Sequence, residues 1–165
     1  MPSRCLHLWG ERVFKKNDRE NYEAFMQSAK TVHTTGLLPH EVCKTALEGT
    51  NDASDVIWRS MVMRLKEIQS KPGSKTFIPI CDMSGSMTGL PMDVAAALSL
   101  LIAESSPTDS PFHGKIIPFS NNPKLLVVPD IPDHDNGVIT VGSLKKRLEW
   151  IHLIEWGMAT NFAKV

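Results

Sequence analysis

The sequence predicts an α/β fold in which a short α-helical segment precedes part of a doubly wound, Rossmann-like sheet. Three observations support this prediction. Helical periodicity dominates the first 71 residues, a Lys-Pro-Gly-Ser break follows at residues 71–74, and short apolar runs then alternate with an Ala- and Leu-rich stretch. We therefore expect two segments, residues 1–71 and residues 75–165, that meet at the break.

Three helices are expected in the first segment. One begins at Asp18 and extends to about residue 32. A second begins at Pro39, a residue type favoured at the first helical position, and ends at Glu48 before Gly49. A third is capped by Asn51 or Asp52, and its apolar residues recur at helical spacing: Ile57, Met61, Leu65 and Ile68.

The second segment is expected to alternate strands and helices. The run Phe-Ile-Pro-Ile-Cys at residues 77–81 predicts a first strand, and Gly89 and Pro91 precede a helix over residues 92–104. The run Lys-Ile-Ile-Pro-Phe-Ser at residues 115–120 predicts a second strand, and residues 125–128 a short third one. A last helix, capped by Ser143, carries the apolar residues Leu144, Leu148 and Ile151.

Two prolines interrupt the predicted strands. A proline removes one hydrogen bond from a sheet, so it belongs at an edge, at a strand end or in a bulge. Pro79 would be tolerated if its missing N–H faced an unpaired edge, which we expect the first strand to keep. Pro118 predicts a bulge or an early end of the second strand.

The loop after the first predicted strand has the pattern Asp-x-Ser-x-Ser, formed by Asp82, Ser84 and Ser86. A carboxylate and two hydroxyls are hard oxygen ligands, which suit Mg²⁺ or Mn²⁺ better than Zn²⁺. Gly85 is expected to let this loop bend without a Cβ clash. Such loops at the carboxyl ends of strands are where open α/β sheets bind ligands. The alternative is that the three side chains only cap the following helix.

The segments CDMSGSM, GLPMDVAAALSLLIAE, PFHGKIIPFSNNPKL and LEWIHLIEWGMATNF occur in this order between residues 75 and 165. In this order they resemble the von Willebrand factor type A (vWA) domain, and more closely the vWA-like half of a plant and giant-virus family named domain of unknown function 2828. The segments LLPHEVCKTALEG and IWRSMVMRLKE resemble the helical stretch before that half. This stretch is itself distantly similar to Ro-type RNA-binding proteins.

The resemblance implies a metal-ion-dependent adhesion site. In such a site Asp82, Ser84 and Ser86 would match the first metal loop, and Thr160 would match the threonine of the second loop. The third loop follows a fourth strand, which the 165 residues do not reach, so the resemblance implies a partial vWA sheet. The function that it implies is non-enzymatic binding of Mg²⁺ or Mn²⁺ and of a protein partner that offers an acidic residue.

Two other functional classes remain open. In a phosphohydrolase of the haloacid-dehalogenase kind Asp82 would be the nucleophile, but that chemistry needs a second aspartate where Ser84 stands. An RNA–protein scaffold follows from the Ro-type resemblance, and RNA would then be the partner. That reading needs a long basic helical array, whereas this chain has 18 basic and 18 acidic residues.

Composition sets the remaining expectations. The absence of net charge gives no sign of a DNA-binding or membrane-binding surface. No apolar stretch approaches the roughly 20 residues that span a bilayer, and the amino terminus lacks the apolar core of a signal peptide. Cys5, Cys43 and Cys81 form no Cys-x-x-Cys pair, which argues against a disulfide framework or a zinc site. We therefore expect a cytoplasmic protein.

Overall fold

The structure is a computed structural model that describes residues 3–28, 31–49, 53–71, 73–120, 122–132 and 142–154. In chain order, its elements are α1 (Ser3–Trp9), the π-helix η1 (Gly10–Lys15), α2 (Arg19–Ser28), α3 (Pro39–Glu48), α4 (Ser54–Gln69), β1 (Ile80–Cys81), the 3₁₀ turn η2 (Gly85–Met87), α5 (Leu90–Ser105), β2 (Lys115–Pro118), β3 (Leu126–Val127) and α6 (Ser143–Leu153). The predicted α/β class is confirmed.

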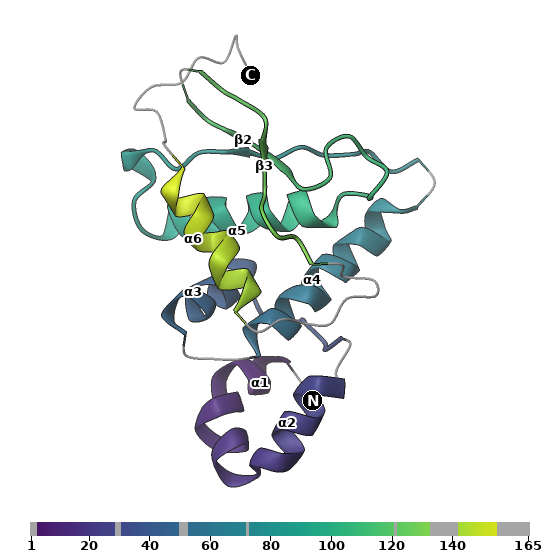
Figure 1. Cartoon of the computed structure of the whole chain (residues 1–165), viewed down its shortest axis with the longest axis vertical. Helices are drawn as coiled ribbons and strands as arrows, with labels where there is room; N and C mark the ends of the chain where they lie inside the picture. Colours follow the sequence, from purple (N-terminus) through teal and green to yellow (C-terminus); the bar gives the residue numbers. More distant parts are fainter. Residues whose placement is uncertain are drawn as a thin grey trace.

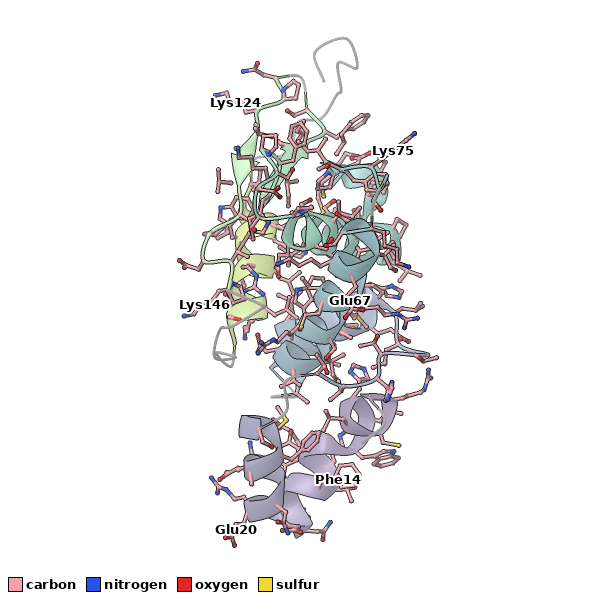
Figure 2. The ribbon with its side chains drawn as sticks, turned by 90° about the vertical axis from the view of Figure 1, so that its right-hand side faces the viewer. Phe14, Glu20, Glu67, Lys75, Lys124 and Lys146 are labelled. Atoms are coloured by element: carbon pink, nitrogen blue, oxygen red, sulfur yellow. The ribbon has the colours of Figure 1, made fainter. Side chains whose placement is uncertain are left out.

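Helix α5 lies at the centre of the molecule (Figure 1). The sheet packs against one side of α5, and α3, α4 and α6 pack against the other. The end of the molecule farthest from the sheet is formed by α1, α2 and the π-helix η1 (Figure 1). Figure 2 shows the same arrangement from the side, with Glu20 near one end and Lys124 near the other.

One apolar cluster joins the two predicted segments. It includes Ile57 and Trp58 of α4 together with Leu100 of α5 and Leu148 of α6, all at most 1% exposed. At about 25 cal/mol per Å² of buried apolar surface, side chains of this size supply most of the driving force for folding. The division into residues 1–71 and 75–165 stays a prediction. Side chains from both segments pack in the same apolar cluster.

The helices of the core largely follow the predicted positions. Helix α3 has the predicted bounds, and Gly49 after it adopts the left-handed conformation (φ 66°) that ends many helices. Helix α2 ends at Ser28 and is therefore shorter than predicted. The Val32 amide, which was expected to lie in this helix, donates instead to Ser60 Oγ of α4 at 2.8 Å. Asn51 and Asp52, the predicted caps of α4, lie outside the described residues.

The predicted cap of α6 is wrong. Gly142 occupies the capping position and Ser143 is the first helical residue. The acceptor comes instead from α4, where Asp55 receives hydrogen bonds from Gly142 N (2.7 Å), Ser143 Oγ (3.0 Å) and Leu144 N (2.8 Å). A carboxylate at a helix amino terminus satisfies its unpaired N–H groups and complements the helix dipole. Asp55 therefore fixes α6 against the helical segment.

The sheet has the order β1-β2-β3, with β1 parallel to β2 and β3 antiparallel to β2. The β1–α5–β2 unit is a parallel crossover of the kind that α/β folds use. The strands are shorter than predicted, and Phe77 lies before β1 with 52% of its surface exposed.

The two prolines explain part of this shortening. Ile117 N donates a hydrogen bond to Pro79 O at 3.0 Å, so the C=O of Pro79 faces β2. The N–H and C=O of any one strand residue point to the same side of the strand. The missing N–H of Pro79 therefore faces β2, at the start of β1, and the prediction that it faces the unpaired edge is wrong. The predicted early strand end is confirmed, because β2 ends at Pro118 and β3 pairs only with Lys115 and Ile116.

Candidate functional site

The candidate metal loop continues directly from the carboxyl end of β1. Side chains alternate across an extended backbone, so Cys81 and Met83 point toward the core and are 1% and 4% exposed. Asp82 and Ser84 project on the other side and are half-buried. The two buried neighbours anchor the loop and hold its polar side chains at the surface.

Local hydrogen bonds bring the three predicted ligands together. Ser84 N donates to Asp82 Oδ1 at 2.9 Å, and the hydroxyls of Ser84 and Ser86 lie 3.0 Å apart. The η2 turn closes with a bond from Met87 N to Ser84 O at 2.9 Å, and Thr88 Oγ1 donates to Gly85 O at 2.6 Å. Hydrogen bonds among its own residues therefore add to the packing of Cys81 and Met83 in holding the loop.

The separation of the two hydroxyls fits a hard divalent ion. Mg²⁺ binds oxygen at about 2.0–2.1 Å in an octahedron, whose adjacent ligands are then roughly 2.9 Å apart. Ser84 Oγ and Ser86 Oγ share a hydrogen bond at 3.0 Å, a separation that is also compatible with two such adjacent positions. Asp82 Oδ1 accepts a hydrogen bond from the Ser84 amide, and the Asp82 carboxylate would supply the charged ligand of the set.

The capping alternative is wrong for the helix that follows. Helix α5 has Gly89 at its capping position and no side-chain capping bond, so neither Asp82 nor the two serines cap it. The expectation for Gly85 is also wrong, because this residue does not adopt a left-handed conformation and a Cβ there would meet nothing. The left-handed residue is Gly89 (φ 90°), where the chain turns into α5.

The fourth predicted ligand, Thr160, lies outside the described residues. In the part of the chain that the structure describes, no three His, Cys, Asp or Glu side chains come together as a metal-binding group. The candidate set takes two of its three members from serine and has a single carboxylate. Such a set carries one negative charge, which favours weak binding.

Cys81 lies between β1 and α5 beside this loop. Its Sγ is 3.7 Å from Ala95 O. Burial raises the pKa of the Cys81 thiol to about 11, a hydrogen bond with Ser99 acts in the opposite direction, and the charge of Asp82 adds to the rise. Because the thiolate is the reactive form, this rise in pKa lowers the reactivity of Cys81, whose buried side chain packs in the core.

The structure also brings together polar residues that the sequence did not single out. A cavity of about 90 Å³ opens between α3, α5 and α6, and its polar lining residues are His40, Lys44, Glu48, Asp93 and His152. Glu41, next to His40, lies in the first turn of α3, where its Oε2 accepts a hydrogen bond from the Leu38 amide at 2.9 Å. His40, Lys44 and Glu48 share one face of α3 at intervals of four residues, but no local pattern joins them to Asp93 and His152, because these two come from α5 and α6.

The comparisons with known proteins identify the family of the chain. The family model described as domain of unknown function (DUF7788) matches residues 76–165, and the chain belongs to this family. The chain is also similar to an uncharacterized protein of Acanthamoeba polyphaga mimivirus, with 31% identity over 157 residues. No solved structure matches. The resemblance to vWA domains stays a prediction.

The similarity to the viral protein covers 92% of this chain but only 25% of the relative. The chain thus spans about a quarter of the length of the curated relative it matches. The similarity extends over both the helical segment and the α/β segment, in agreement with the core that they share.

Within the described ranges, no helix combines the length and the apolar character that a membrane-spanning helix needs.

Proposed function

We propose that the chain is a non-enzymatic, metal-dependent protein-binding module that uses Asp82, Ser84 and Ser86 as ligands for Mg²⁺ or Mn²⁺. The observation that carries the proposal is the 3.0 Å separation of the two serine hydroxyls in a loop that hydrogen bonds among its own residues help to hold in place. The loop lies at the carboxyl end of β1, where α/β sheets bind ligands. The three side chains make no capping bond to α5 that would explain them otherwise.

The charge of the ligand set supports the choice of partner. A divalent ion held by one carboxylate and two neutral hydroxyls keeps a net positive charge and open coordination positions. An acidic side chain of a partner protein would supply both the missing charge and a further oxygen ligand. Thr160 is proposed to join the set when the partner is bound.

The proposal is tested by calorimetric titration of the 165-residue chain with Mg²⁺ and with Mn²⁺. We expect saturable binding with a Kd on the order of millimolar, because the set has one charged ligand. Asp82→Ala should abolish the heat of binding. Thr160→Ala should leave it unchanged, since the ion is titrated without a partner.

Asp109→Ala provides the matched control, because Asp109 is an exposed loop carboxylate outside the candidate set. Its titration should match that of the unsubstituted chain. Circular dichroism shows whether each variant is folded. A folded chain that takes up neither ion, or one that binds equally well after Asp82→Ala, would overturn the proposal.

A further inference from the structure

Helices α3, α5 and α6 pack against one another (Figure 1), and the cavity of about 90 Å³ lies where they meet. Every residue that lines this cavity belongs to one of the three helices and to the described ranges. The packing of the helices therefore sets the walls of the cavity, and the proposed metal site uses none of its residues.

The floor of the cavity is apolar. Cys43 of α3, Ala96 of α5 and Leu148 of α6 line it and are 3%, 1% and 1% exposed. Burial is the main cause that raises the pKa of the Cys43 thiol well above its ordinary value. The thiol is therefore neutral, and the floor offers a hydrocarbon group a contact surface without charge.

The rim of the cavity carries more negative than positive charge. Asp93 of α5 is half-buried and Glu48 of α3 is exposed, and both line the cavity together with Lys44. In the described part of the chain, no ion pair or side-chain hydrogen bond engages any of these three side chains. Lys44 thus leaves both carboxylates available, and a half-buried carboxylate without a partner favours a cation beside it.

His152 of α6 adds a further acceptor. Its Nδ1 lies 2.7 Å from Leu148 O, an atom that can only accept, so Nδ1 carries a proton. The neutral ring then has its free lone pair on Nε2. Each of the three helices therefore contributes one acceptor to the lining: Glu48 from α3, Asp93 from α5 and His152 from α6.

We propose that this cavity binds a short aliphatic primary amine, with the ammonium group among Glu48, Asp93 and His152 and the hydrocarbon part on the apolar floor. A primary ammonium group has three N–H donors, which match the three acceptors. A cavity of about 150 Å³ holds the six carbon atoms of benzene, so one of about 90 Å³ suits roughly four non-hydrogen atoms. Propylammonium has this size.

The spacing of the acceptors distinguishes an ammonium group from a metal ion. Hydrogen bonds from a charged N–H to oxygen are about 2.7–2.9 Å long, whereas metal–oxygen bonds are about 2.0–2.6 Å long. The acceptors around an ammonium group therefore lie farther apart. This agrees with the described residues, in which no three His, Cys, Asp or Glu side chains form a metal-binding group. An anion of the same size would meet two carboxylates and a single lysine.

NMR titration of the full chain with propylammonium chloride tests the proposal, and sodium chloride at the same concentration gives the baseline. The methyl signals of Ala96 and Leu148 report on the floor, and EDTA in the buffer keeps the result independent of the proposed metal site. We expect saturable shifts of both signals with a Kd on the order of millimolar, because so small a ligand makes few contacts. 1-Propanol and propionate, an uncharged and an anionic ligand of similar size, should each bind more weakly by roughly tenfold or more.

Two variants separate the charge of the site from its volume. Asp93→Asn keeps the shape of the side chain and removes its charge, so the Kd for propylammonium should rise roughly tenfold. Asp109→Asn is the matched control and should leave the Kd unchanged, because Asp109 is an exposed loop carboxylate outside the cavity. Ala96→Val should also raise the Kd roughly tenfold, since its two added methyl groups take up space at the floor.

Circular dichroism and a thermal melt show whether each variant is folded. A titration without saturable shifts at Ala96 and Leu148 in the unsubstituted chain would overturn the proposal. Equal affinity for 1-propanol, or an unchanged Kd in folded Asp93→Asn, would do the same, because either result would show that the carboxylates do not select the ligand. Should Asp93→Asn fail to fold, the comparison of the three ligands on the unsubstituted chain still decides between these outcomes.

Discussion

In the helical core, polar side chains that are far apart in the sequence meet in the interior, whereas each polar contact of the loop at residues 82–88 joins neighbours. Arg147 of α6 contacts Glu104 of α5 across 43 positions, and Leu144 contacts Asp55 across 89. The contacts of Asp82 with Ser84 and of Ser84 with Ser86 each span two positions. Substitutions in the helical core should therefore lower the stability of the protein, and substitutions in the loop should alter binding.

The centre of the core network is Glu104, which is 1% exposed. Its carboxylate accepts hydrogen bonds from Arg147 Nε at 2.7 Å and from Trp58 Nε1 at 3.1 Å. This one side chain therefore joins α4, α5 and α6. Arg147 is itself 1% exposed, and its Nη1 has no hydrogen-bond partner within the described structure. A buried guanidinium depends on its carboxylate partner for charge compensation.

The largest effect is expected for Glu104→Ala. This change leaves a buried positive charge uncompensated and removes the acceptor of the Trp58 indole, so the free energy of unfolding should fall by about 3–5 kcal/mol. Urea denaturation followed by circular dichroism measures the fall. Glu149→Ala, the same change at an exposed position of α6, should cost less than about 1 kcal/mol. Equal effects of the two variants would contradict the importance of the buried network.

An intermediate effect is expected for Asp55→Ala. Loss of the carboxylate leaves Gly142 N, Ser143 Oγ and Leu144 N without their acceptor, and loss of a helix cap costs about 1–2 kcal/mol. Asp55→Asn keeps an acceptor oxygen and should cost less. Urea denaturation gives the stabilities, and amide exchange at Leu144 should accelerate more in the alanine variant. Unchanged exchange would show that α6 does not depend on Asp55.

The smallest effect on stability is expected for Ser86→Ala. Its side chain is exposed and contacts only the Ser84 hydroxyl, so the free energy of unfolding should change by no more than about 0.5 kcal/mol. Calorimetric titration of the same variant should show weaker Mg²⁺ binding, because one proposed ligand is lost. A stability loss as large as that of Asp55→Ala would remove the distinction between the core and the loop.

The sequence predicted most where local signals act. Helix α3 was located from Pro39 and Gly49, whose backbone preferences act within one turn. The loop Asp82–Ser84–Ser86 was identified from its pattern, and the structure brings the two hydroxyls together. The early end of β2 followed from Pro118. No expected helix covered residues 3–15, where α1 and η1 lie.

What the sequence by itself determined is the α/β class, the positions of the core helices and the candidate metal loop. These depend on periodicity, on proline and glycine conformation and on ligand type, which act over a few residues. The tertiary structure alone showed that Asp55 caps α6, that Glu104 joins three helices, and which way Pro79 faces. Such contacts arise only when segments far apart in the chain pack together, and no local pattern records which distant partner a buried polar group will meet.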